Sequence, residues 1–517
     1  MKTNFAIECL KWAGKTPDNP VIHSVEQGIF SYRSMWEQAR RFGNVLHRLG
    51  VNQGDRYACV LPNIPEAAVV FLGGQLIGRV PVMVFIGYKP REFEHIFRIS
   101  GAKIVITTAE YRKKVEEATL KEGIKIVVLD EPTEEFPSLS RLMFEASDDL
   151  NPILTQADEV AEIMFTSGTS GAPKGVPHTH LNMLKQCEFM RSASWAGLGP
   201  GDVIYTQAPI GFAIGLHCHI HFPFYSGASS VYCTERVSPE RFLGLVEKYR
   251  VTHIITTATH LWKILSVPPQ PQSMKTVKSL AVGGSAVTKS LFEKWREAYG
   301  GLLPRPSFSM TELFGSALGM PMGEGRPDTV GRLWPHWEAR IVDPADPGGR
   351  REVNKGDPGI LWLKGPSVLP FYWNDKKLTE EKLKDGWFKT DDLMVEDEEG
   401  YFHHVGRLDE LIKSSGWRVS PVEIENVLRE HPSIEEVAVV GVNDQVKGQE
   451  IVAVIIPSGP VTDEGSLFEE LKTFVRERLA GYKVPARFVL RESLPRTATG
   501  KVQRKQLGEE LSRFDTK

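Results

Sequence analysis

A run of ten residues, TSGTSGAPKG at positions 166–175, constrains this chain more than any other feature of its sequence. It follows an apolar stretch, residues 161–165, that is typical of a buried strand. Three glycines free the backbone to approach a ligand, four hydroxyl groups can donate hydrogen bonds, and Lys174 adds a positive charge. These are the parts of a phosphate-binding loop. Lys174 precedes its glycine, so the run is not a Walker A loop, and a plain linker seldom follows a buried strand so closely.

Strand and helix patterns alternate through the first four hundred residues, which predicts an α/β fold built on parallel sheets. Residues 104–107 and 124–129 indicate strands, and the polar residues 110–121 between them indicate a helix. The same order of strand, helix, strand and helix recurs at residues 253–256, 260–265, 277–282 and 289–299. A Gly-Gly-Ser turn at 283–285 ends the second strand of this unit. Because ligands bind at the carboxyl ends of strands in open sheets, this turn is a candidate ligand contact.

The chain is too long for one hydrophobic core, since 517 residues exceed the size at which chains divide into domains. Residues 330–405 have short strand patterns between Pro, Gly and Asp clusters, which indicates an antiparallel sheet or barrel. A compact α+β pattern follows, so we place a domain boundary between 1–406 and 407–517. Within the second domain, Ser420, Pro421 and Glu423 predict a helix start with a capping box.

Composition excludes several classes of protein. The formal charge of −3 gives no bulk attraction to nucleic acid, so we expect no nucleic-acid partner. Five cysteines without a CxxC pair make a disulfide framework or a cysteine zinc site improbable and favour a cytoplasmic protein. The most apolar stretch, residues 71–87, is too short and too interrupted to cross a bilayer, so we expect no integral membrane segment.

The run at 166–175 resembles the phosphate-loop signature of the adenylate-forming superfamily, which comprises acyl-CoA and aryl-CoA synthetases, luciferases and peptide-synthetase adenylation domains. Further motifs follow in the superfamily's order: FSMTE at 308–312, WFKTDD at 387–392, GRLDELIK at 406–413 and PRTATGK at 495–501. Residues 61–84 resemble its N-terminal segment, so the resemblance covers nearly the whole chain. It implies a large N-terminal domain of two α/β subdomains plus a distorted β-barrel, and a small mobile α+β C-terminal domain.

The same resemblance implies a reaction in two steps. The carboxylate of a small acid attacks the α-phosphate of ATP and releases pyrophosphate, and the thiol of coenzyme A then attacks the acyl-adenylate. The implied contacts to the nucleotide fall on the phosphate loop, the adenine turn and the ribose carboxylate: Thr166, Ser167, Gly168, Thr169, Ser170, Gly171 and Lys174; Gly283, Gly284, Ser285 and Phe308; Asp392 and Arg407.

Three residues carry the implied catalytic roles. Thr311 would bind the α-phosphate, and Glu312 would hold Mg²⁺, a cation that prefers oxygen ligands. Lys501 would bridge the carboxylate and the α-phosphate during adenylation, although a lysine near a C-terminus is more often part of a solvated tail.

The second step is assigned by the resemblance to the C-terminal domain. Its hinge falls on Asp409, in the motif that also contains Lys413. Gly416 and Trp417 lie in the loop that would face coenzyme A after the domain rotates. An ordinary loop aspartate is the alternative for Asp409.

The acyl pocket is predicted around an apolar, glycine-rich segment that looks like the corresponding part of benzoate- and aminobenzoate-type CoA ligases. Its candidate lining residues are Phe212, Ala213, Gly215, Leu216, His217 and Gly283. Such walls suit a flat ring or a short chain and disfavour a charged one. His217, His219 and His221 would share a face on a strand and could bind a metal, whereas on a helix only the first and last align.

Two positions depart from the superfamily's pattern. Asp391 stands where the motif has glycine, and it either lies harmlessly outside the site or disturbs the ribose contact. Phe308 stands where the motif usually has tyrosine, which keeps the stacking face and loses the hydroxyl.

The leading hypothesis is therefore an AMP-forming acyl-CoA or aryl-CoA ligase that uses ATP, Mg²⁺ and coenzyme A. A stand-alone adenylation enzyme that loads a separate carrier protein is the first alternative. A catalytically silent nucleotide-binding regulator is the second, and a light-emitting oxygenase has no support among the residues. A homodimer is a weak expectation for the assembly.

Overall fold

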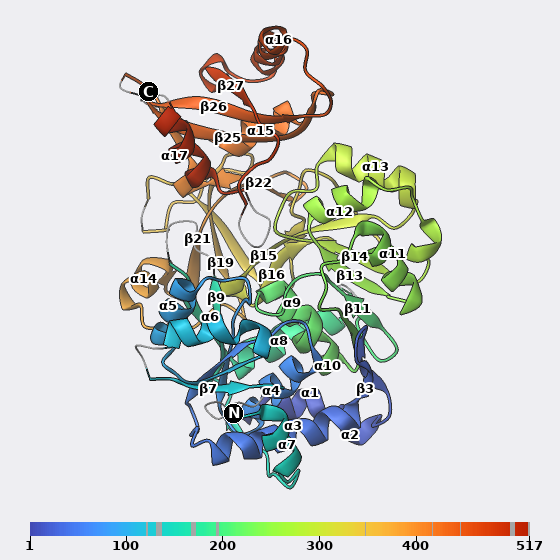
Figure 1. Ribbon diagram of the computed structural model, residues 1–517. Helices are drawn as coiled ribbons and strands as arrows, with labels where there is room; N and C mark the ends of the chain where they lie inside the picture. The colour runs from blue at the N-terminus through green and yellow to red at the C-terminus, as the bar shows by residue number, and fades with distance from the viewer. Residues whose placement is uncertain are drawn as a thin grey trace.

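The computed structural model describes residues 1–119, 123–130, 137–166, 172–192, 196–346, 348–415, 417–444, 446–496 and 502–514. Figure 1 shows a large N-terminal domain, drawn from blue to orange, and a smaller C-terminal domain at one end of the molecule, drawn in orange-red to red. No helix of the described chain is long and apolar enough to cross a membrane.

A nine-stranded sheet forms the centre of the N-terminal domain. Its strands, in spatial order, are β17 (Arg332–Leu333), β16 (Gly315–Gly319), β15 (Pro304–Met310), β14 (Ser279–Val282), β13 (His253–Thr256), β11 (Val203–Tyr205), β12 (Ser229–Tyr232), β2 (Pro20–Ser24) and β3 (Gly28–Ser31). The pairs from β15 across to β2 are parallel, as the alternation of strands and helices predicts.

Helices cover both faces of this sheet. Three amphipathic helices, α11 (Pro239–Lys248), α12 (Ala258–Leu265) and α13 (Lys289–Tyr299), pack their apolar sides on one face, to the right in Figure 1. The helices α8 (His180–Arg191) and α10 (Phe222–Ser226) belong to the larger core that includes the other face. The sheet is therefore buried on both sides, and its parallel strands end in loops that are free to bind a ligand.

A second, four-stranded parallel sheet forms the other α/β subdomain. Its strands are β5 (Val80–Met83), β4 (Arg56–Val60), β6 (Ala102–Thr107) and β7 (Lys125–Val128), and its helices are α3 (Tyr32–Arg48), α4 (Pro65–Leu76), α5 (Pro90–Ser100) and α6 (Ala109–Thr119). A separate antiparallel hairpin, β9 (Val160–Thr166) and β10 (Lys174–Thr179), packs beside β5.

The predicted antiparallel region is a five-stranded half-barrel. It consists of β18 (Glu338–Val342), β19 (Gly359–Lys364), β20 (Leu383–Lys384), β21 (Trp387–Glu396) and β22 (Phe402–Arg407). Every pair in it is antiparallel, so the barrel-type sheet predicted from the short strands and turn clusters is confirmed.

The C-terminal domain contains the last five-stranded sheet. Its strands are β23 (Ile412–Ser414), β24 (Trp417–Val419), β25 (Ile434–Asp444), β26 (Gly448–Pro457) and β27 (Arg487–Leu490). One face carries α15 (Pro421–Leu428) and α16 (Glu464–Arg476), and the other carries α17 (Arg504–Phe514). The boundary between residues 406 and 407 and the hinge near Asp409 stay predictions.

The capping box predicted at Ser420 is wrong. Pro421 does begin α15, but the Ser420 hydroxyl donates to the carbonyl oxygen of Val405 and makes no capping hydrogen bond. Glu423 instead accepts a hydrogen bond from Lys483 at 2.5 Å. The Ser420 side chain thus links α15 to β22, a contact between distant segments that local sequence cannot indicate.

Candidate active site

The predicted phosphate loop starts at Thr166, the last residue of β9, and ends at Gly175 in β10. Thr166 and Lys174 are paired across the two strands. Ser167, Gly168, Thr169, Ser170 and Gly171 lie outside the described residues. Two contacts fix the returning strand: Trp373 donates its backbone N–H to Gly175 at 2.9 Å, and His95 Nε2 contacts the Pro173 carbonyl oxygen at 2.9 Å.

The predicted adenine turn follows β14 directly. Gly283 donates its backbone N–H to Thr256 at 3.0 Å, and Gly284 has φ = +78°, a conformation that favours glycine. A Cβ on Gly283 would meet only the hydroxyl oxygens of Ser309 and Ser307, at 3.5 and 3.6 Å. Gly283 itself is buried, whereas Gly284 and Ser285 after it are exposed, and a Cβ at Gly283 would make only ordinary contacts beside β15.

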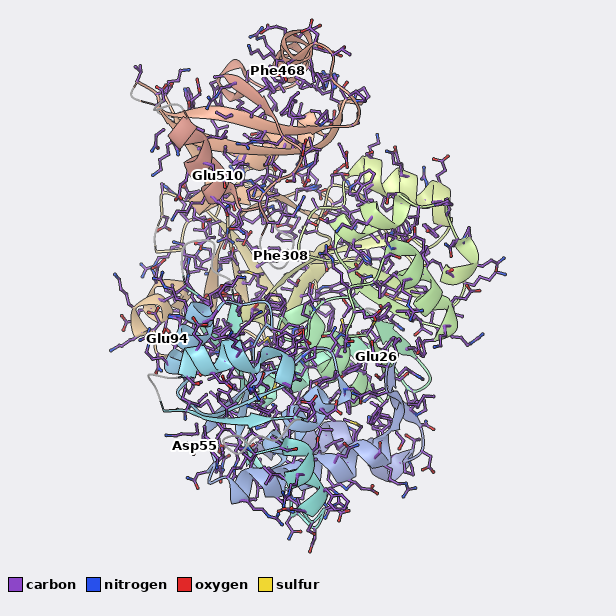
Figure 2. All side chains as sticks on the ribbon, viewed as in Figure 1. Glu26, Asp55, Glu94, Phe308, Phe468 and Glu510 are labelled. Carbon is purple, nitrogen blue, oxygen red and sulfur yellow. The ribbon has the colours of Figure 1, made fainter. Side chains whose placement is uncertain are left out.

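Phe308 and the Thr311–Glu312 pair come from β15 and from the short turn of helix that ends it, Thr311–Leu313. Phe308 is 9% exposed and lies in the middle of the molecule, below the C-terminal domain (Figure 2). Phe314 then takes a left-handed conformation, φ = 49°, which stops the helical turn and directs the chain back into β16. The pair thus sits at the carboxyl end of a central parallel strand.

Two contacts hold this turn. Tyr372 donates its hydroxyl to Glu312 Oε1 at 3.0 Å, and Leu369 donates its N–H to the Glu312 carbonyl oxygen at 2.8 Å. Burial and then the Glu312 carboxylate raise the pKa of Tyr372 well above its usual range, so Tyr372 remains a hydrogen-bond donor. Glu312 is a partly exposed carboxylate with a fixed orientation, which fits the oxygen ligand that Mg²⁺ requires.

The predicted ribose carboxylate is buried and doubly held. Asp392 is 6% exposed, its Oδ1 contacts His404 Nε2 at 2.9 Å, and its Oδ2 accepts from Arg407 at 3.3 Å. Burial alone would lower the pKa of Arg407, but Asp392, Asp409 and Asp391 outweigh it and raise that pKa.

Asp391, the departure from the glycine motif, is ion-paired beside Asp392. It accepts a hydrogen bond from Lys382 Nζ at 2.5 Å and lies 3.5 Å from Arg407. The extra negative charge is therefore partly neutralised by Lys382, a buried cation at the end of the helix α14 (Lys376–Lys382).

The predicted hinge and coenzyme A residues lie along the connection into the C-terminal domain. Arg407 Nε donates to Asp409 Oδ1 at 3.0 Å, and Lys413 donates its backbone N–H to Gln449 at 2.8 Å. Trp417 is 55% exposed and stacks on Tyr482 with ring centroids 4.6 Å apart. Gly416 and the catalytic candidate Lys501 lie outside the described residues.

The predicted acyl segment packs tightly. The Phe212 ring lies 4.4 Å from that of Phe85, and the short helix α9 (Ala213–Leu216) follows it. A Cβ on Gly215 would come within 2.0 Å of the Pro209 carbonyl oxygen, so only glycine fits there. Leu216 and His217 are both buried.

The three histidines after α9 form a turn of π-helix, His217–His221, and all three are buried. The helix places His217 and His221 in contact and directs His219 to the ring of Tyr232. The described residues contain no group of three or more His, Cys, Asp or Glu side chains that could hold a metal ion. The segment is therefore helical, and only His217 and His221 align, as expected for a helix.

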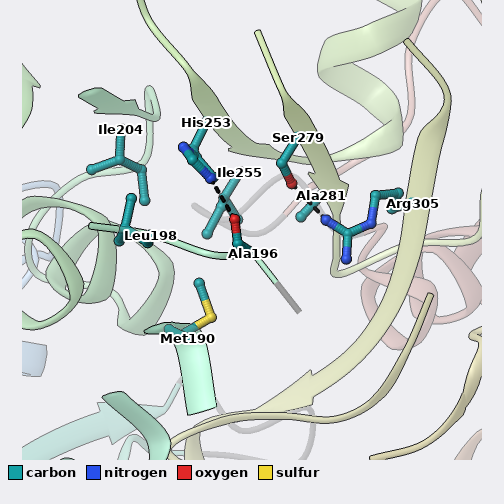
Figure 3. A pocket seen from close by; sticks show the side chains of 9 residues that line it. All are labelled: Met190, Ala196, Leu198, Ile204, His253, Ile255, Ser279, Ala281 and Arg305. Carbon is teal, nitrogen blue, oxygen red and sulfur yellow. Dashed lines mark hydrogen bonds between the residues drawn. The ribbon is translucent and has the colours of Figure 1, made fainter. Parts of the chain in front are cut away.

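A small cavity of about 10 Å³ lies against the nine-stranded sheet (Figure 3). Apolar side chains from β13, β14 and α8 form its walls, and its polar residues bond to one another: Arg305 donates to Ser279 at 2.6 Å, and His253 Nε2 contacts the Ala196 carbonyl oxygen at 2.8 Å. Ala281, on β14, lines it two residues before Gly283.

The chain matches a known protein family over most of its length. Residues 9–373 match the family described as AMP-binding enzyme, and residues 423–501 match the AMP-binding enzyme C-terminal domain. The chain belongs to the AMP-binding enzyme family. The predicted membership of the adenylate-forming superfamily is thereby confirmed.

Relatives of this AMP-binding enzyme include ligases for quite different acids. A long-chain-fatty-acid–CoA ligase of Escherichia coli O6:H1 is 30% identical, over 95% of this chain and 92% of that protein. The structure of a benzoate CoA ligase from Burkholderia xenovorans LB400 is 28% identical with a TM-score of 0.89, over 98% of this chain and 99% of that one. An o-succinylbenzoate CoA synthetase from Bacillus subtilis, in complex with ATP and magnesium ion, is 25% identical with a TM-score of 0.84, over 98% and 100%.

Three residues of the AMP-binding enzyme's site were missed from the sequence: Tyr372, Lys382 and His404. Each contacts a predicted residue, namely Glu312, Asp391 and Asp392. None lies in a motif. The Tyr372–Glu312 contact joins residues 60 positions apart, and the His404–Asp392 contact joins two strands. Only the pairing of β21 with β22, which aligns Asp392 with Arg407, could have pointed to His404.

Proposed function

We propose that this AMP-binding enzyme is an AMP-forming carboxylic acid:CoA ligase that acts on an aromatic acid or a small cyclic or short- to medium-chain acid. The observation that carries the proposal is the position of Gly283 and Glu312 just beyond the paired parallel strands β14 and β15, together with the buried contact of Asp392 with Arg407 between the paired strands β21 and β22. The benzoate and o-succinylbenzoate ligases among its relatives, and the tight acyl segment, support the choice of acid. A fatty-acid ligase at 30% identity keeps the longer chains in the panel to be tested.

In the proposed adenylation step, the chain binds and orients two anions. Asp392 accepts the ribose hydroxyls, and Gly283, Gly284, Ser285 and Phe308 surround the adenine. Thr311 binds the α-phosphate, while Thr166, Lys174 and the loop between them hold the β- and γ-phosphates. Glu312 would hold Mg²⁺, which would supply positive charge against the phosphates, and Lys501 stabilises the charge that develops as the carboxylate attacks.

In the proposed thioester step, the C-terminal domain turns about Asp409. The loop of Gly416 and Trp417 then faces the acyl-adenylate, and Lys413 moves with it. The coenzyme A thiol attacks the acyl carbonyl carbon, the bond to phosphate breaks, and AMP leaves. Closure of this kind replaces one set of catalytic residues by another and excludes water from the thioester step.

The test is to incubate the purified protein with ATP, Mg²⁺, coenzyme A and a mixed panel of aromatic, alicyclic and linear acids, with a parallel reaction that lacks coenzyme A. Mass spectrometry is expected to detect one acyl-CoA together with an equal amount of AMP. Acyl-adenylate or AMP without any acyl-CoA would favour the stand-alone adenylation enzyme. If no acid yields AMP, the proposal is wrong.

A further inference from the structure

A chain of buried polar side chains leads from the core to the acyl segment. Glu162, on β9, is 1% exposed, and its Oε2 contacts His221 Nε2 at 3.1 Å. His221 Nδ1 in turn contacts His217 Nδ1 at 2.8 Å. Each of the two contacts joins one donor to one acceptor, so the three side chains form a single continuous line of hydrogen bonds.

The line ends at His217 Nε2, which is buried and has no hydrogen-bond partner within the part of the chain that the structure describes. Buried polar atoms are nearly always hydrogen-bonded, so an isolated one calls for a partner from outside the protein. A water molecule or a ligand group are the two candidates.

His217 lies between the predicted acyl segment and the Thr311–Leu313 turn. It directly follows α9 and stands one helical turn after Ala213, a candidate pocket residue. Its ring also lies 4.5 Å from that of Phe314, the residue that ends the Thr311–Leu313 turn. The ring of Phe222 also stacks on the same imidazole, with the ring centroids 5.1 Å apart.

The position of the proton on Glu162 determines whether His217 Nε2 is a hydrogen-bond donor or acceptor. If Glu162 is ionised, it accepts from His221 Nε2–H, His221 accepts from His217 Nδ1–H, and His217 Nε2 is an acceptor. If Glu162 carries the proton, every bond reverses and Nε2–H is a donor. Burial raises the pKa of Glu162 to about 8, against the opposing effect of His178, so the second arrangement dominates near neutral pH. A hydroxyl group can pair with either form, because it both donates and accepts.

We propose that His217 Nε2 is the specificity-determining contact of the acyl pocket, and that the preferred acid carries a hydroxyl or a similar hydrogen-bonding substituent on its ring or chain. Glu162 and His221 are positioning residues that hold the imidazole and its tautomer. This inference rests on the proposed function, since it assigns the class of acid bound at that site. It places a single polar atom among apolar walls, the arrangement by which small-molecule pockets choose an orientation.

The test compares matched acids that differ only by a hydroxyl group, such as benzoate with its three hydroxybenzoate isomers and cyclohexanecarboxylate with its hydroxylated forms. Isothermal titration calorimetry measures binding, and AMP release measures kcat and KM. The wild-type protein is expected to bind one hydroxylated isomer about tenfold more tightly than its parent acid. His217→Leu is expected to reduce that ratio of affinities to about one, whatever its effect on the parent acid alone.

His219→Leu is the matched control, because His219 is equally buried in the same turn and faces Tyr232. It is expected to keep the preference for the hydroxylated isomer. Glu162→Gln tests the positioning role: it is expected to change KM for the hydroxylated acid and leave KM for the parent acid unchanged.

The outcomes separate the two proposals. If the wild-type protein forms acyl-CoA but binds no hydroxylated acid more tightly than its parent, the ligase stands and the role of His217 is overturned. An unchanged preference in His217→Leu overturns it as well and leaves a water molecule as the partner of Nε2. If no acid of the panel binds at all, both proposals fail.

Discussion

The predicted nucleotide side and the predicted acyl side of the site are built in different ways. On the nucleotide side, charged groups hold one another: Asp392 contacts His404 and Arg407, and Glu312 accepts from Tyr372. On the acyl side, close packing fixes the backbone, and Gly215 has no room for a single added carbon. Polar contacts preserve a fixed chemistry, whereas packing sets a shape that can differ between relatives with different acids.

The largest effect that would test this difference is expected from Asp392→Ala. The substitution removes the predicted ribose acceptor and leaves His404 and Arg407 without the carboxylate that both contact. Loss of one partner of a buried charge pair typically costs about 2–5 kcal/mol, so kcat/KM for ATP is expected to fall by about 10² or more.

Steady-state AMP release measures this effect, and circular dichroism checks that the protein is folded. Asp343→Asn, at a carboxylate ion-paired with Arg351 away from the site, is the control and should keep wild-type activity. A loss of less than about threefold in Asp392→Ala would remove the ribose role from Asp392.

The next effect is on stability, through Glu162. Burial raises the pKa of this carboxyl to about 8 in the folded protein. Its stabilising contribution is therefore complete below the unfolded pKa near 4.5 and is lost as the pH rises through about 8, on the order of a few kcal/mol in all. Glu162→Gln has no such proton to lose.

Denaturant unfolding at pH 5.5 and pH 8.5 gives the comparison. The free energy of unfolding of the wild-type protein is expected to fall relative to that of Glu162→Gln as the pH rises. The lowered pKa values of His178 and His217 act in the opposite direction, but both residues remain in each protein. Parallel pH profiles of the two proteins would contradict the prediction.

A pair of glycine substitutions sharpens the comparison between packing and binding. Gly215→Ala forces a Cβ to within 2.0 Å of a backbone oxygen, so it is expected to destabilise the protein by about 1–3 kcal/mol. Gly283→Ala places its Cβ in ordinary contact at 3.5 Å, so its stability should stay within about 1 kcal/mol of the wild type.

Thermal unfolding measures the stability of both variants. The rate of AMP release with large and with small acids is then measured for Gly283→Ala. Gly283→Ala should discriminate against the larger acids, because the added methyl group occupies the face beside Ser307 and Ser309. Equal loss of stability in both variants would contradict the predicted difference in packing between the two glycines.

The smallest effect is expected from Asp391→Gly, which restores the superfamily's residue. Asp391 is ion-paired with Lys382 and Arg407 and is partly exposed, so its removal should change kcat/KM for ATP by less than about threefold. The same AMP-release measurement applies. A tenfold rise in activity would mean that the extra carboxylate weakens nucleotide binding in this chain.

Much of the fold was predictable because it depends on local pattern. The strand His253–Thr256 and the helix Lys289–Tyr299 begin and end at the predicted residues, since a short apolar run and an amphipathic run with a Thr288 cap each define one element. The capping box at Ser420 failed because a distant carbonyl takes the hydroxyl.

The candidate site divides in the same way. Motif residues such as Glu312 and Asp392 were predicted, but the residues that hold them, Tyr372 and His404, were not, because they meet only after the half-barrel forms. For the three histidines the sequence left strand and helix open, and the partner of His221, Glu162, lies 59 residues away. Such contacts follow from tertiary packing, which no periodicity encodes.

Arg407 links the predicted ribose carboxylate, Asp392, to the predicted hinge residue, Asp409. Its guanidinium donates to Asp392 with one nitrogen and to Asp409 with another. A ligand that weakens the contact between Asp392 and Arg407 also changes the strength of the contact between Arg407 and Asp409. Linkage then requires reciprocity: a change in the chain beyond β22 that shifts Arg407 must change nucleotide affinity by the same factor. Through Arg407, nucleotide binding at Asp392 and the position of the chain at Asp409 are therefore expected to be coupled. The affinity of Asp409→Ala for ATP, compared with that of the wild-type protein, measures this coupling.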